Sequence, residues 1–140
     1  MNRYFDIALN LASERFSGER DKVIADALTR NVNYFNIVCS SLNELDFVKD
    51  LNDRYGQNSC FTLGVHPHNA NELNENTLKC IKDYIEIHQP SAVGETGLDF
   101  FRNLSSYENQ INAFEQQIII SIENNLPLFL HQRDCLLYTS

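Results

Sequence analysis

The strongest constraint on the fold is a regular alternation of short apolar segments with longer amphipathic ones. The short segments predict five strands, at 4–9, 33–39, 59–65, 91–95 and 127–131. Between them, apolar residues at helical spacing predict helices over 17–30, about 42–51, 74–88 and 106–124. Because parallel strands need crossover helices between them, this alternation favours one continuous α/β layer around a parallel sheet.

The third and fourth helices carry further local signals. Asn74 is expected to cap the third helix, and Pro90 to end the connection that follows it. In the fourth helix, Ile111, Phe114, Ile118 and Ile122 are expected to lie on one face.

Length and charge limit the classes of protein that fit. The chain has 140 residues, enough for one cored domain, whereas a closed eight-stranded α/β barrel typically needs about 250 residues. The net charge of −8 argues against a broad basic surface for nucleic acid, although metals in an acidic site can supply positive charge.

The four cysteines lack C-x-x-C spacing, and we see no signal peptide or membrane-spanning run. We therefore expect no membrane association and a cytoplasmic location, with the nucleus as an alternative.

Polar side chains gather just after the predicted strands. His66 and His68 follow the third strand, Glu95 closes the fourth, and His131 closes the fifth, with Arg133 two residues later. In a parallel α/β sheet these positions share one edge, at the carboxyl ends of the strands, where sites in such folds are built. We therefore expect these residues to converge although they lie far apart in sequence.

The residue types suit a metal site, but each has an ordinary alternative. Imidazole and carboxylate ligands bind zinc and other divalent ions, and a carboxylate can bridge two of them. Arg102 could hold a phosphate with forked hydrogen bonds, as could the arginine after the fifth strand. Against this, Glu95 could be a solvated charge, His131 a hydrogen-bonded core histidine and Asp99 a turn-former. Residue spacing alone indicates a weakly defined hydrolase-like site.

Four motifs in order strengthen the interpretation. They are D-I-A-L-N-L at 6–11, G-V-H-P-H at 64–68, G-E-T-G-L-D at 94–99 and H-Q-R-D at 131–134. Together they resemble the TatD family of metal-dependent DNases, over nearly the whole chain.

The resemblance implies a partial TIM (β/α) barrel of the metal-dependent hydrolase superfamily, with about five of eight strands present. It implies a deoxyribonuclease in which a metal-activated water attacks phosphodiester bonds of DNA, mainly single-stranded DNA or DNA ends. Glu95 would be a metal ligand that bridges two ions, and His131 a ligand of one. His66 and His68 would contact phosphate and Arg133 would position it. Mg²⁺ is the expected ion, with Mn²⁺ or Zn²⁺ as alternatives.

Two departures from the family pattern shape the remaining expectations. The first strand lacks the family's H-x-H pair, with Asn10 near the second histidine's place and Asp6 as an uncertain substitute. The family's last histidine and aspartate ligands come from strands after the fifth. We therefore expect 1–134 to be the N-terminal portion of a TatD-like barrel and 135–140 to be a non-family tail of artefactual origin. An inactive truncated fragment, or a superfamily hydrolase of small amides or esters, is the alternative function.

Overall fold

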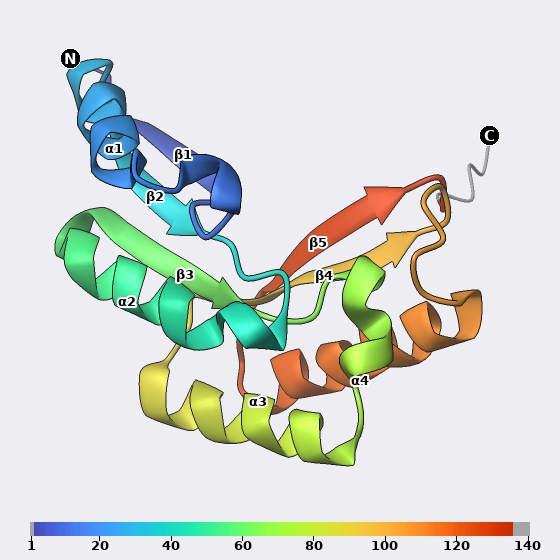
Figure 1. The fold of residues 1–140 in the computed structure, drawn as a ribbon. Coiled ribbons are helices and arrows are strands. Elements are labelled where there is room, and N and C mark those ends of the chain that lie inside the picture. Colours follow the sequence, from blue (N-terminus) through green and yellow to red (C-terminus); the bar gives the residue numbers. More distant parts are fainter. Residues whose placement is uncertain (1, 136–140) are drawn as a thin grey trace.

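Five parallel strands form one sheet in the order β1-β2-β3-β4-β5 in the computed structural model, which describes residues 2–135 (Figure 1). The strands are β1 (Tyr4–Leu9), β2 (Val32–Ile37), β3 (Ser59–Leu63), β4 (Ala92–Asp99) and β5 (Leu128–Arg133). The α-helices are α1 (Arg20–Thr29), α2 (Leu45–Tyr55), α3 (Glu75–His88) and α4 (Tyr107–Glu123). The predicted alternation is confirmed. Most of the expected tail, 136–140, lies outside the described residues.

Short 3₁₀ helices occupy several connections, which the sequence analysis did not anticipate. They are η1 (Glu14–Phe16), η2 (Leu42–Glu44), η3 (Gly56–Asn58) and η4 (Pro67–Glu72). The most relevant is η4, because it takes the chain away from the end of β3 immediately after the first site histidine.

The core lies between the sheet and the helices, and α2, α3 and α4 cover one face of the sheet (Figure 1). Sheet residues such as Phe35, Leu63 and Val93 pack there with Ile81 of α3 and Ile120 of α4, and all five side chains are almost fully buried. Burying each aliphatic side chain of this size contributes about 1.5–3 kcal/mol, so this layer holds the strand ends in place.

The expected cap of α3 is present. Asn74 Oδ1 accepts hydrogen bonds from the backbone N–H groups of Asn76 and Thr77, and Thr77 Oγ1 accepts one from Asn74 N–H. This reciprocal pair is a capping box, which satisfies N–H groups that have no partner inside the helix.

The apolar face predicted for α4 is not its most buried face. Three of its residues, Ile111, Phe114 and Ile118, are half-buried, and Ile122 is 73% exposed. The buried residues of α4 are Gln110, Ala113, Gln117, Ile120 and Ser121. The amphipathic pattern treats glutamine as a surface residue, but an amide can be buried when all its hydrogen bonds are satisfied.

The strands β4 and β5 extend further than the sequence indicated, to Asp99 and Arg133. Gly97 pairs in register with His131, and Asp99 with Arg133. A side chain at residue 97 would collide with the carbonyl oxygen of His131, and φ there is +141°. Glycine therefore permits the close approach that keeps β5 beside β4 up to its site residues.

Candidate metal centre

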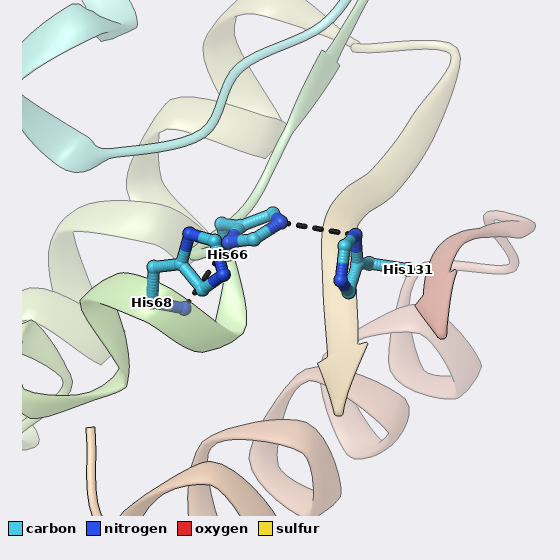
Figure 2. Close-up of side chains that lie close together, drawn as sticks. All are labelled: His66, His68 and His131. Atoms are coloured by element: carbon cyan, nitrogen blue, oxygen red, sulfur yellow. Dashed lines mark hydrogen bonds between the residues drawn. The ribbon is translucent and has the colours of Figure 1, made fainter. Parts of the chain in front are cut away.

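Two histidines lie where η4 follows β3. His66 is the N-cap of η4, Pro67 occupies its first turn, and the His66 Nδ1 atom accepts a hydrogen bond of 3.1 Å from His68 N–H. The His66 backbone N–H donates to the Ser40 carbonyl at 3.0 Å, which ties the end of β3 to the end of β2. The ring of His66 is therefore held in one orientation, with Nε2 facing the neighbouring strands (Figure 2).

Glu95 on β4 and His131 on β5 meet this ring. The His131 Nδ1 atom lies 3.0 Å from Glu95 Oε1 and 3.1 Å from His66 Nε2. The third side of the triangle, from His66 Nε2 to Glu95 Oε1, is 3.8 Å. The convergence expected from the strand ends is confirmed for these three residues, and Figure 2 shows the two imidazoles facing each other.

Asp99, at the end of β4, joins the remaining histidine to the cluster. Its Oδ2 atom lies 2.6 Å from His68 Nε2 and 3.2 Å from His131 Nε2, and its Oδ1 atom accepts hydrogen bonds from the backbone N–H groups of Phe101 and Arg102. Complete burial would raise the pKa of Asp99, but these hydrogen bonds, led by that from Arg102, outweigh burial and hold the pKa well below its usual range. Asp99 is thus a buried anion that anchors two imidazoles.

Asp99 is the site residue that the sequence analysis missed, because it treated this aspartate as a turn-former. In the structure Asp99 has both roles. Its Oδ2 atom contacts an imidazole of the site, and its Oδ1 atom accepts the backbone hydrogen bonds of the turn. The available signal was its place in the G-E-T-G-L-D motif together with a strand that continues past Glu95.

The proton position of His66 follows from its partners. Burial, and then the neighbouring imidazoles of His131 and His68, lower the pKa of His66 to about 3, so its ring is neutral near pH 7. Since His66 Nδ1 accepts from the backbone, its proton lies on Nε2, the atom that faces His131 Nδ1. His131 Nδ1 also lies 3.0 Å from Glu95 Oε1, so a nitrogen and a carboxylate oxygen lie side by side where one cation could bind both.

The donor set fits a divalent metal. Ligand nitrogens of His66, His68 and His131 all lie within 4.8 Å of one another, and Glu95 adds a carboxylate oxygen to the group. Atoms that share one ion at about 2.1 Å each are separated by roughly 3–3.5 Å, close to the 3.0 and 3.1 Å that separate His131 Nδ1 from Glu95 Oε1 and His66 Nε2. Mixed imidazole and carboxylate ligands suit zinc, manganese and related ions.

The other expected residues make different contacts. The guanidinium of Arg133 lies over the ring of Phe101, 4.3 Å from its centroid. Arg102 enters the site through its backbone N–H. Asp6 Oδ1 accepts a hydrogen bond from Ala8 N–H within β1.

A parallel sheet flanked by helices, with histidines and carboxylates at the carboxyl ends of its strands, defines a large part of a hydrolase-type α/β barrel. Solved structures agree. An uncharacterized amidohydrolase from Saccharomyces cerevisiae superposes with a TM-score of 0.85 at 28% identity, over 94% of this chain and 48% of that one. A hydrolase of the TatD family from Entamoeba histolytica superposes equally well, with a TM-score of 0.85 at 26% identity, over 95% of this chain and 50% of that one. The fold expected from the sequence, a partial barrel with five of its strands, is therefore confirmed.

The chain belongs to the family described as TatD related DNase, whose model matches residues 5–138. Among curated relatives, the "3'-5' ssDNA/RNA exonuclease TatD" of Shigella flexneri serotype 5b is 40% identical over 131 residues, and that of Escherichia coli K12 is 39% identical over 131 residues. Each alignment covers 93% of this chain and 50% of the relative, so the chain spans about half the length of the curated relatives it matches. Within the described residues, no helix is both long enough and apolar enough to span a bilayer.

Proposed function

We propose that this protein is a metal-dependent nuclease that hydrolyses phosphodiester bonds of single-stranded DNA from an end, with RNA as a second substrate. The observation that carries the proposal is the triangle of Glu95, His131 and His66, in which a carboxylate oxygen and two imidazole nitrogens lie 3.0 to 3.8 Å apart. Family membership and relatives named as exonucleases of single-stranded DNA and RNA support the substrate class.

In this proposal Glu95 and His131 would hold divalent metal, and the carboxylate of Glu95 could serve as a ligand of two ions. Mg²⁺ is the expected ion, and Mn²⁺ and Zn²⁺ are the alternatives. When bound, the metal supplies a Lewis acid for the phosphoryl oxygen and lowers the pKa of a coordinated water. The metal charge also offsets the acidic character of the chain, whose net charge of −8 would otherwise repel a polyanion.

The remaining groups orient the site and the substrate. Asp99 fixes the His131 and His68 rings through hydrogen bonds of 3.2 and 2.6 Å, so these rings present constant faces to the substrate. His66 and His68 contact the substrate phosphate. Arg133 positions a phosphate as well, and stacking on Phe101 at 4.3 Å limits the motion of its guanidinium.

The test is cleavage of end-labelled single-stranded DNA by the full-length protein that contains this sequence, with Mg²⁺, with Mn²⁺ and with EDTA. Glu95→Gln keeps the size of the side chain and removes its charge. We expect a loss of at least about 100-fold in turnover and a weaker affinity for Mn²⁺. Loss of a residue that only hydrogen-bonds to a metal ligand already lowers metal affinity or activity by about 10–100-fold, and Glu95 is proposed as a ligand itself. Glu115→Gln is the control, since Glu115 is exposed on α4. Metal-dependent cleavage that Glu95→Gln leaves intact would remove Glu95 from its assigned role.

A second candidate, hydrolysis of a small cyclic amide, is favoured by the structural likeness to the yeast amidohydrolase. The same centre could polarise an amide carbonyl, because fold and metal do not determine the substrate. A panel containing single-stranded DNA, single-stranded RNA and a cyclic amide separates the two candidates. Turnover of the amide without turnover of either nucleic acid would favour the second.

A further inference from the structure

Two fully buried glutamines on α4 reach the backbone of the site-bearing strands. Gln110 and Gln117 are 0% exposed, and they lie seven residues apart, two turns along one face of the helix. A buried amide is costly unless each of its polar atoms has a partner, so the partners of these two side chains identify what the helix face holds.

Gln117 holds the residue before His66. Its Oε1 atom accepts a hydrogen bond of 2.8 Å from Val65 N–H, and its Nε2 atom donates to the Val65 carbonyl at 3.1 Å. The same Nε2 atom donates to the Ala113 carbonyl within the helix at 3.1 Å. Both backbone groups of Val65 are therefore bound by one side chain.

Gln110 makes the same paired contact with Asp99. Its Oε1 atom accepts from Asp99 N–H at 2.8 Å, and its Nε2 atom donates to the Asp99 carbonyl at 3.1 Å. Nε2 also donates to the Ser105 carbonyl at 3.0 Å, and the Ser105 hydroxyl donates to the His68 carbonyl at 2.9 Å. Gln110 thus contacts one member of the Asp99–His68 pair and reaches the other through a single serine.

The contacts of the two glutamines lie beyond the end of the β3–β4 ladder, where backbone groups need side-chain hydrogen-bond partners. The ladder between β3 and β4 pairs Thr62 with Ala92 and Leu63 with Val93. Beyond it, the two strand ends carry backbone N–H and C=O groups that a side-chain amide can satisfy, because it offers a donor and an acceptor at peptide-like spacing. The other buried polar side chain of α4, Ser121, instead donates its hydroxyl to the Leu126 carbonyl.

We propose that Gln110 and Gln117 are positioning residues, which set the distance between the β3 and β4 ends and thereby the geometry of His66, His68 and Asp99. They do not touch the substrate or the metal. The inference rests on the proposed function for its activity readout only. The helix that crosses from β4 to β5 therefore controls alignment within the site as well as covering the sheet.

The test compares Gln110→Met and Gln117→Met with Asn109→Ala in the full-length protein. Methionine keeps the length of the side chain and removes both hydrogen-bonding groups. Asn109 is the matched control, because its amide also links α4 to η4, through Asn71 Oδ1 at 2.7 Å, but on the exposed surface. We expect each methionine variant to lose about 10–100-fold in Mn²⁺ affinity and in kcat, with KM for single-stranded DNA nearly unchanged. Asn109→Ala should keep all three values.

A spectroscopic readout on the metal-free protein separates positioning from general destabilisation. The His68 Nε2 proton faces Asp99 Oδ2 at 2.6 Å and should give a downfield NMR resonance. Gln110→Met should shift or broaden it, and Asn109→Ala should not. Ser105→Ala removes only one hydroxyl and serves if the methionine variants fail to fold. It should cause the same shift with a smaller loss of affinity, and Ser105→Thr should reverse it.

These measurements test the positioning role and the nuclease proposal separately. A lower melting temperature with unchanged Mn²⁺ affinity and an unchanged His68 resonance in the folded variants overturns the positioning role. Wild-type protein that binds Mn²⁺ without cutting single-stranded DNA refutes the nuclease proposal instead, and the affinity and NMR comparisons still decide the role of the glutamines.

Discussion

Replacing Gly64 by alanine tests whether the site depends on close contact between two strand backbones. A Cβ atom built on Gly64 would lie 2.6 Å from Gly94 Cα and 2.7 Å from both Gly94 C and Gly94 N. All three atoms belong to the backbone, so no flexible side chain can move aside. Gly64 precedes the His66 loop, and Gly94 directly precedes Glu95, so the collision would separate the two segments that carry these site residues.

The size of the effect follows from these distances. Ordinary contact begins at 3.4 Å, so β3 and β4 must move apart by about 0.8 Å at this point. The overpacking is expected to cost about 1–3 kcal/mol of stability. A displacement near 1 Å would alter the 3.8 Å spacing between His66 Nε2 and Glu95 Oε1, and a misplacement of that size costs about 100-fold in turnover.

The control is Gly18→Ala, which introduces the same methyl group where nothing lies within 4 Å but φ is +76°. It should cost roughly 1 kcal/mol through backbone strain alone. Urea denaturation and turnover of labelled single-stranded DNA by the full-length protein are measured for both variants. We expect comparable losses of stability but a large loss of turnover for Gly64→Ala only. Wild-type turnover and Mn²⁺ affinity in Gly64→Ala would refute the argument that this backbone contact sets the site.

Two further predictions test the fold outside the site. Cys39 is fully buried, and burial raises the pKa of its thiol to about 12, whereas Cys80 is exposed. Under native conditions at pH 8, iodoacetamide should therefore label Cys80 well before Cys39, as followed by peptide mass spectrometry, and equal rates would contradict the burial of Cys39. Asn74→Ala should destabilise the protein by about 1 kcal/mol in urea denaturation, because it removes the cap of α3, while Asn74→Ser should stay near wild type. An Asn74→Ala variant as stable as wild type would show that the capping box contributes nothing.

The sequence was sufficient for the parts of the fold that depend on local periodicity. Strand β1 lies where the apolar pattern predicted it, and Asn74 caps α3 as expected. The meeting of Glu95, His66 and His131 also followed, because parallel topology brings the carboxyl ends of strands to one edge. The family resemblance then correctly indicated the family to which the chain belongs.

What could not be predicted depends on partners far away in sequence. The burial of Gln117 makes sense only once Val65, 52 residues earlier, offers both backbone groups to its amide. For this reason apolar periodicity identified a face of α4 that includes the exposed Ile122 and leaves out the two buried glutamines. Asp99 was missed in a similar way, since its second oxygen finds its imidazole partners only after η4 and β5 are in place.

The centre is therefore aligned largely by backbone contacts, and its side chains inherit that alignment. Gly64 allows β3 to approach β4, and Gly97 allows β5 to approach β4 beside His131. The two glutamines of α4 then bind the backbone where the β3–β4 ladder has ended. Since the atoms of the triangle formed by Glu95, His131 and His66 lie only 3.0 to 3.8 Å apart, shifts below 1 Å in a strand change their geometry substantially. Substitution of these glycines should consequently lower activity as strongly as substitution of residues that contact the substrate.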